Sequence, residues 1–235
     1  MRRILLSVTA VCFVAGFITT PVASAQQSVN LWVGAFVPNG LETRVGNDVL
    51  VQDQQVFLFD FGRLTGPTFG GEWLTALGNY FEAGAGVGFY QRSTGAIDRD
   101  FVDPNGFNIA ANFKMRTVPF SATFRALPFG HDAPVQPYVG AGVGVHVWRY
   151  SETGDFVLAD GTISRGEVNT ATGTTVGPIV LGGIRFPIGR AAPGFEVRWQ
   201  HAVGDLPAPG PGHDFLGSQI DLGGFNYLFT FNIRF

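Results

Sequence analysis

The sequence predicts an all-β fold, an eight-stranded antiparallel up-and-down transmembrane β-barrel. Three observations indicate this class. Only 14% of the 235 residues are charged, and mean hydropathy is +0.20, whereas about 25% of residues are charged in a typical soluble domain. After the first 25 residues, no apolar run is long enough for a membrane-spanning helix. Several segments instead alternate apolar and polar residues with a period of two, as strands with one lipid-facing side do.

Residues 1–25 have the three parts of a secretory signal peptide. Arg2 and Arg3 form a positive start, and residues 4–18 form an apolar stretch. Ala23-Ser24-Ala25 then supplies the small-x-small cleavage site. The alternative is a membrane anchor helix, but the apolar stretch is shorter than the about 20 residues that a spanning helix needs.

The mature domain is expected to cover residues 26–235. It contains no cysteine, because Cys12 lies within the signal segment, and this excludes disulfides and thiolate chemistry. Loss of Arg2 and Arg3 leaves 13 basic and 18 acidic residues, a net charge of −5. No basic stripe is present to neutralise phosphates, so no nucleic acid is expected as a partner.

Eight strands are expected, and their connections alternate in length. The strands are predicted near residues 30–37, 66–76, 80–91, 109–126, 135–149, 171–186, 194–202 and 219–235. The short connections are 77–79, 127–134 and 187–193, and the long ones are 38–65, 92–108, 150–170 and 203–218. Short periplasmic turns and longer external loops alternate in this way in outer-membrane barrels, and an even strand number places both termini on the periplasmic side.

Residues 56–61 allow two interpretations. This apolar run is either an extension of the second strand above the membrane or a short loop helix. A membrane strand with its own partner would raise the strand count to ten.

The segment GAGVG occurs twice, at residues 84–88 and 140–144. It is not a dinucleotide-binding loop, because Phe89 and Val145 stand where the third glycine is needed and neither copy opens a helix. The glycines are expected to make room for large side chains inside a narrow barrel.

The charged residues of the strands are predicted to face the lumen, since a basic side chain turned to lipid costs about 2–4 kcal/mol at the membrane midplane. This requires a register shift near Thr117–Pro119, because Arg125 has the opposite parity to its neighbours in the fourth strand. Arg–Glu pairs are expected to plug a bore that eight strands leave only wide enough for side chains. The predicted structural network contains six cations and three carboxylates: Glu72, Glu82, Lys114, Arg116, Arg125, Arg185, Glu196, Arg198 and Arg234.

No catalytic, cofactor-binding or metal site is predicted. The histidines are His131 in a short turn, His146 facing inward, and His201 and His213 near the external rim with Ser151, Ser218, Asp205 and Asp214. They form no nucleophile motif and have no metal-ligand spacing. The acidic residues of the long loops are expected to keep those loops solvated rather than to bind calcium. These are Glu42, Asp48, Asp53, Asp60, Asp98, Asp100, Asp103, Glu152, Asp155 and Asp160.

The last strand ends in an aromatic residue and alternates throughout. One face carries Phe225, Tyr227, Phe229, Phe231, Ile233 and Phe235. Phe235, with Phe231 and Phe229, resembles the C-terminal assembly signal of bacterial outer-membrane barrels.

Together, the signal segment, the eight strands, the GAGVG strands and the closing YLFTFNIRF resemble the small bacterial outer-membrane β-barrel proteins, the porin-like barrels of the OmpA/OmpX type. The resemblance implies a monomer integral to the outer membrane. Its partners would be outer-membrane lipid and, during biogenesis, periplasmic chaperones and the barrel-assembly machinery.

The expected function is non-enzymatic, with a structural role or an interaction of the external loops with an unidentified ligand. The alternative is a conduit for small, hydrophobic solutes, resembling OmpW-type barrels. A lipid-modifying enzyme is the third interpretation.

Overall fold

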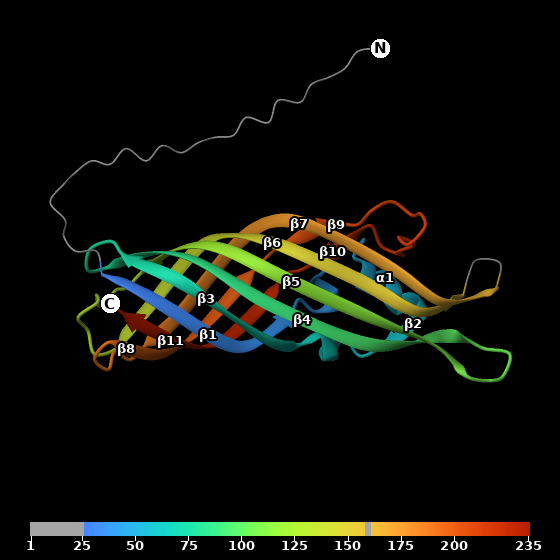
Figure 1. Cartoon of the computed structure of the whole chain (residues 1–235), viewed down its shortest axis with the longest axis horizontal. Coiled ribbons are helices and arrows are strands. Elements are labelled where there is room, and N and C mark those ends of the chain that lie inside the picture. Colours follow the sequence, from blue (N-terminus) through green and yellow to red (C-terminus); the bar gives the residue numbers. More distant parts are fainter. Residues whose placement is uncertain (1–25, 158–160) are drawn as a thin grey trace, which may run out of the picture.

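The computed structural model describes residues 26–157 and 161–235, so the expected signal peptide lies outside the described residues. Eight antiparallel strands form a closed ring (Figure 1). They are β1 (Gln27–Pro38), β3 (Gly66–Ala76), β4 (Phe81–Val102), β5 (Asn108–Ala126), β6 (Gln136–Val157), β7 (Ile163–Arg185), β8 (Ala191–Gln200) and β11 (Gly224–Arg234). Each pairs with the next, and the ring closes where β1 pairs with β11, from Ser28↔Arg234 to Pro38↔Gly224. The predicted eight-stranded fold is confirmed.

The strands β4 to β7 extend far beyond the length that a membrane requires. They contain 22, 19, 22 and 23 residues, whereas about 9–11 residues span the hydrocarbon. The prediction of long loops at 92–108 and 150–170 was therefore wrong, because most of both segments is strand. In these outer parts of the strands, many outward-facing residues are small or polar, such as Ser93, Asn112 and Thr172. Their composition is therefore similar to that of a loop, although inward and outward residues still alternate.

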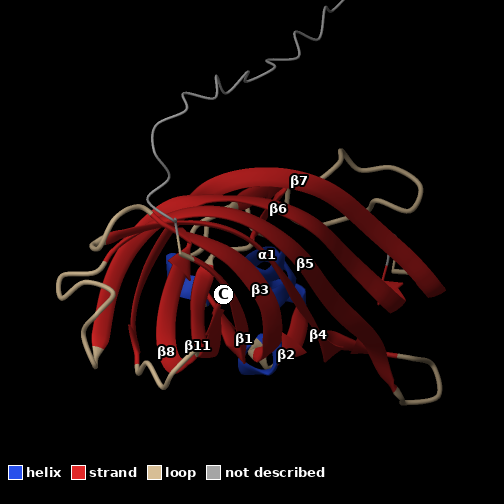
Figure 2. Ribbon diagram, turned by 60° about the vertical axis from the view of Figure 1, so that its left-hand side comes forward, coloured by secondary structure: helices blue, strands red, loops and turns tan. Residues whose placement is uncertain are grey.

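The segment between β1 and β3 folds into one end of the barrel (Figure 2). It contains η1 (Leu41–Thr43), α1 (Val49–Val56), β2 (Phe57–Phe59) and η2 (Phe61–Leu64). The side chain of Asp48 caps α1 by accepting a hydrogen bond from the Leu50 N–H. Of residues 56–61, Val56 ends α1, residues 57–59 form β2 and Phe61 begins η2, so this run is not a single loop helix and does not extend the second strand. β2 pairs with the outer part of β4, with Phe57 opposite Asp98.

A second inserted segment connects β8 to β11. It contains β9 (Val203–Asp205) and β10 (Gln219–Asp221), which pair with each other and not with the ring. The predicted last strand therefore starts at Gly224 and not at residue 219.

The hydrophobic core lies where these two segments meet the long strands. The ring of Phe113 makes edge contacts with Phe57 and Phe59, at 5.5 and 5.2 Å between centroids, and Phe215 lies 5.8 Å from Tyr150. All belong to or pack on one buried cluster. A buried ion pair adds to it: Arg44 Nε lies 2.8 Å from Asp48 Oδ1. We call residues 39–65 the plug segment, because they fill the outer half of the barrel.

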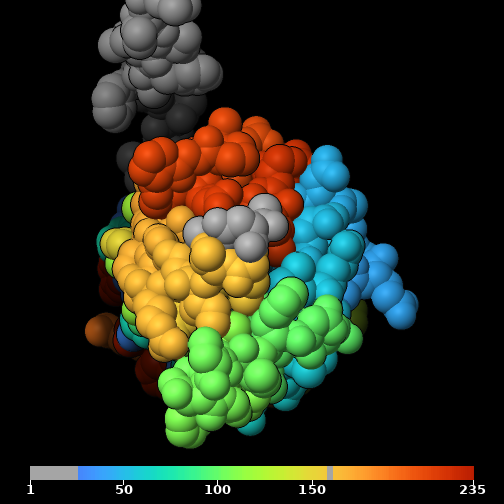
Figure 3. Space-filling model, turned by 90° about the vertical axis from the view of Figure 1, so that its right-hand side faces the viewer, coloured from blue at the N-terminus to red at the C-terminus, as the bar shows by residue number. Residues whose placement is uncertain are grey.

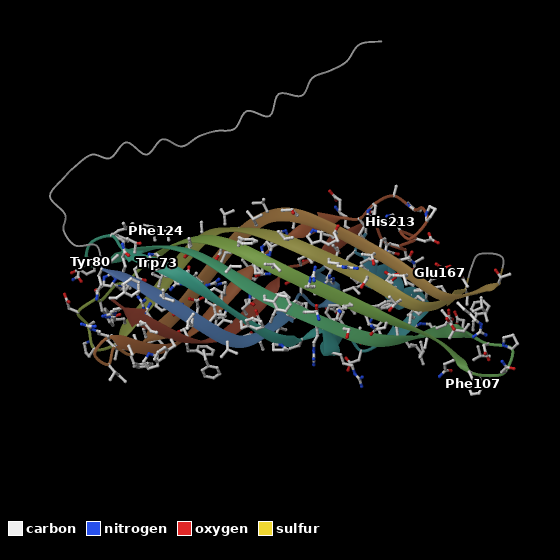
Figure 4. The ribbon with its side chains drawn as sticks, viewed as in Figure 1. Trp73, Tyr80, Phe107, Phe124, Glu167 and His213 are labelled. Atoms are coloured by element: carbon white, nitrogen blue, oxygen red, sulfur yellow. The ribbon has the colours of Figure 1, made fainter. Side chains whose placement is uncertain are left out.

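The outer wall of the barrel is apolar. Phe229, Val139 and Val176 are 69%, 61% and 62% exposed, which fits side chains that face lipid. Trp73, Tyr80 and Phe124 lie at the end of the barrel that carries the short turns, where β1 begins and β11 ends. Phe107 lies at the opposite end (Figure 4). Among the described residues, no helix is long and apolar enough to cross a bilayer.

The GAGVG glycines have the expected packing role. A Cβ at Gly84 would lie 2.5 Å from Glu72 Oε1, and one at Gly142 would lie 2.1 Å from the Ala122 carbonyl oxygen. Glycine therefore allows both the buried carboxylate and the neighbouring strand to approach.

Candidate functional site

The middle of the lumen is filled by a network of buried charges. Arg125 pairs with Glu72 and lies 3.1 Å from Glu196. Arg198 lies 2.7 Å from Glu196 and 3.6 Å from Glu72. The Tyr138 hydroxyl donates to Glu196 at 3.0 Å. Two arginines and two carboxylates from β3, β5 and β8 therefore neutralise one another inside the ring.

A second part of the network lies nearer the short turns. Glu82 Oε1 accepts a hydrogen bond from Arg185 Nη2 at 2.8 Å and lies 3.0 Å from the His131 ring. Arg234 Nη2 donates to Gln136 Oε1 at 2.6 Å. The network leaves little space, since a cavity beside Trp32 in the lumen has a volume of only about 20 Å³. That is room for about one water molecule.

Two residues predicted to face the lumen do not. Lys114 and Arg116 are exposed on the outer face of β5. The expected register shift is absent, because Val87↔Phe120 and Tyr90↔Thr117 continue one register. Charge on this face is tolerated because β5 continues past the apolar band of the wall. The lumen network thus holds four cations and three carboxylates, so the predicted surplus of three positive charges falls to one.

The cavity with the clearest chemical character lies at the outer mouth. We call it the mouth pocket, and it has a volume of about 510 Å³. Its apolar wall comes from Val56, Phe57, Phe156, Val157 and Leu216. Its polar lining includes Asp53, Glu152, Glu167, Asn169 and Asp214, and no lysine or arginine of the described residues lines it. The plug segment, β6, β7 and the segment before β10 converge at this end of the molecule (Figure 3).

Two carboxyl groups of the mouth pocket are buried. Asp53 Oδ2 accepts a hydrogen bond from the Tyr150 hydroxyl at 3.1 Å. Asp53 and Glu152 are hydrogen-bonded to each other and to the Tyr150 hydroxyl, and Asp53 Oδ1 and Glu152 Oε1 are buried without a basic side chain beside them. Burial, followed by the negative charge of Glu152, raises the pKa of Asp53 well above its usual value. The mouth pocket therefore combines apolar walls with a pair of buried carboxyl groups that no basic side chain of the described residues neutralises.

The sequence interpretation missed this site. Asp48, Asp53, Asp98 and Glu152 were expected to be solvated loop residues, but all four are buried, because the plug segment folds inward and β4 and β6 continue as strands. Asp160 lies outside the described residues. The apolar run from Val49 to Phe59 was the available signal, since a solvated loop rarely carries so many large apolar residues.

The rings of the two rim histidines contact partners other than the rim serines and carboxylates. The His213 ring hydrogen-bonds to the Thr170 carbonyl oxygen at 2.8 Å, and the His201 ring stacks on Trp199 with centroids 6.2 Å apart. Inside the barrel, His146 is fully buried. No group of three or more potential metal ligands occurs among the described residues.

The residues of the expected assembly signal lie on the lipid-facing side of the last strand. Phe229, Phe231 and Phe235 are 69%, 46% and 61% exposed. The Phe235 ring lies 5.1 Å from that of Trp73, and its N–H donates to the Gln27 carbonyl oxygen at 3.1 Å. The end of the chain therefore contacts both β1 and β3.

The chain is similar in fold to solved outer-membrane barrels. The outer membrane protein OprG from Pseudomonas aeruginosa matches with a TM-score of 0.52 and 12% identity, over 90% of this chain and 96% of that one. Neisserial surface protein A (NspA) matches with a TM-score of 0.43 and 13% identity, over 89% and 97%. Ail of Yersinia pestis, solved with the heparin analogue sucrose octasulfate, matches with 0.39 and 13%, over 90% and 99%.

No family model and no curated protein matches the sequence. The closed ring, the apolar wall and the fold shared with OprG agree with one another. The chain therefore has the fold of the small outer-membrane β-barrels.

Proposed function

We propose that this barrel is a non-enzymatic, monomeric protein that binds a small amphiphilic cation in the mouth pocket and does not conduct solutes through its lumen. The carrying observation is the buried pair Asp53 and Glu152 in an apolar wall. A buried carboxylate requires a compensating partner. An ammonium group supplies both the charge and the donors, while an attached apolar group fills the space beside Phe57 and Phe156.

The volume and position of the mouth pocket support this proposal. About 510 Å³ falls within the roughly 300–1,000 Å³ range of small-molecule sites. The walls come from the plug segment, from the outer parts of β6 and β7 and from the segment before β10. A ligand bound there would therefore contact the external part of the barrel. The buried charge network behind the plug segment separates the pocket from the periplasmic end.

The test compares three probes of one shape: 4-phenylbutylamine, 4-phenylbutanol and 4-phenylbutyrate. The mature protein is embedded in nanodiscs, and binding is measured by ligand-detected NMR. The amine should bind most tightly, and Glu152→Gln should weaken it at least about 10-fold, since one paired buried charge contributes more than about 1.4 kcal/mol. Glu42→Gln, at an exposed carboxylate outside the mouth pocket, is the matched control. Equal affinity for the amine and the alcohol would contradict the proposal.

The pH dependence provides a second measurement. The folded-state pKa of Asp53 is raised by burial and by Glu152, so the folded protein binds more protons than the unfolded chain in the window between the unfolded and folded pKa values. The free energy of unfolding should therefore fall as pH rises through this window. Amine binding should strengthen over the same window, because the carboxylate becomes charged. Asp53→Asn should weaken both trends, and the remainder belongs to Glu152, whose pKa burial raises to about 7. Glu152, Tyr150, Asp48, Glu167 and Asp214 remain present in that variant as the other titratable groups.

A further inference from the structure

Three cations lie together on the outer wall of the barrel. Lys114 and Arg116 on β5 and Arg149 on β6 are exposed and face outward, and with Gln91 of β4 they surround a hollow of about 160 Å³. We call these three residues the wall cluster. None of their side chains has an ion-pair or hydrogen-bond partner among the residues that the structure describes.

The register places like charges directly opposite each other. Arg116 pairs with Arg149 across β5 and β6, and Lys114 is two residues farther along the same face of β5. Like charges opposite each other on neighbouring strands destabilise a sheet. A bound anion would compensate this repulsion, and arginine side chains match the oxygens of a phosphate group in geometry as well as in charge.

The height of the wall cluster indicates where the anion would come from. Ten residues separate Arg116 from Ala126 at the periplasmic end of β5. With a rise of about 3.3 Å per residue and a strand tilt of about 40°, this corresponds to about 25 Å, the height of the apolar band. The neighbouring outward residues on the periplasmic side are apolar: Phe89, Val118 and Val147. The wall cluster therefore lies at the level of the outer headgroups.

We infer that the wall cluster binds the phosphate of an outer-leaflet membrane lipid. The acyl chains would lie against the apolar wall below the cluster, and the headgroup phosphate would contact Lys114, Arg116 and Arg149. This site faces outward from β5 and β6, whereas the mouth pocket lies inside the ring. The two sites are therefore independent in structure and in test.

The experiment measures retained lipid by native mass spectrometry of the mature protein in detergent micelles. The probes are diphosphoryl lipid A, monophosphoryl lipid A and inorganic pyrophosphate. The wild type should retain diphosphoryl lipid A more strongly than the monophosphoryl form. The variant K114Q/R116Q/R149Q should bind diphosphoryl lipid A on the order of 10- to 100-fold more weakly, because it loses all three charge-assisted contacts to the phosphate.

The matched control removes three other cations from the same end of the molecule, R63Q/R99Q/R165Q, all of which are exposed. It should bind lipid A as the wild type does. The single variants R116Q and R149Q should give intermediate losses and keep the inference testable if the triple variant assembles poorly. Equal lipid retention by wild type and R116Q, or equal loss in the control, would overturn the site. Pyrophosphate binding as tight as that of lipid A would show a site for free anions and overturn the lipid assignment.

Discussion

Glu82 is the carboxylate that neutralises the half of the lumen network nearer the short turns. It is 3% exposed, and its Oε1 lies 2.8 Å from Arg185 and 3.0 Å from His131. Arg185 is itself buried and has no other carboxylate partner among the described residues. The pair is therefore a case in which the loss of one member leaves the other buried and uncompensated.

Replacing Glu82 with glutamine should destabilise the barrel by about 3–5 kcal/mol, because it leaves the Arg185 charge unpaired. Urea unfolding in phosphatidylcholine vesicles measures this change. Glu42→Gln, at an exposed carboxylate, should change stability by less than about 0.5 kcal/mol. The double variant E82Q/R185M should recover much of the loss, since it removes both charges. A loss in the double variant as large as that in E82Q would contradict the pairing argument.

Individual residues also show what the sequence could not specify. The alternation of β5 correctly separates Arg125 from Lys114, but a membrane barrel has two places for a charged side chain: the lumen, or the wall beyond the lipid. The prediction considered only the first and introduced a register shift to place Lys114 and Arg116 there. Whether a residue number is odd or even gives the face of the sheet on which its side chain lies. The position of that side chain along the barrel axis relative to the membrane is a separate quantity, and no local pattern in β5 marks where the membrane ends.

The last strand, β11, closes the ring and ends at the rim with the short turns. Its alternation predicted the lipid-facing side correctly, since Phe225, Phe229 and Phe231 are all exposed. Its start was placed too early because Gln219–Asp221 continues the same period of two, yet it pairs with β9 in the mouth. Periodicity identifies strands, but the choice of partner depends on contacts that are distant in sequence.

Replacing Phe235 with serine should reduce insertion into the outer membrane several-fold while export and signal cleavage continue. Phe235 contacts Trp73 of β3 and its N–H bonds to β1, so the substitution weakens the closing edge, where unpaired strands are otherwise exposed. The amount of heat-modifiable protein in membrane fractions measures the effect. Phe225→Ser, on the same face at the other end of β11, is the matched control. Wild-type amounts of inserted F235S would contradict this role.

The whole barrel is closed at two levels. The plug segment fills the outer half with apolar side chains, and the buried arginines and glutamates fill the middle. The number of strands was predictable from the alternation of short and long connections. The paired charges were predictable because residue parity assigns Arg125, Glu72 and Glu196 to the inner face. The inward fold of the plug segment was not, because it depends on contacts between residues 49–64 and strands that follow much later in the chain.

Two independent barriers give a testable prediction for conduction. The full mature chain should show no steady current in planar bilayers. Residues 39–64 can be replaced by a short turn, since Phe36 lies opposite Gly66 in the ring and a hairpin can join β1 to β3 there. This shortened barrel should also remain closed, because Arg125, Glu72, Glu196 and Arg198 still fill a bore only wide enough for side chains. A salt-proportional current through the shortened barrel alone would show that the plug segment is the sole barrier. A steady current through the full chain would contradict the closed lumen and favour transport of small solutes.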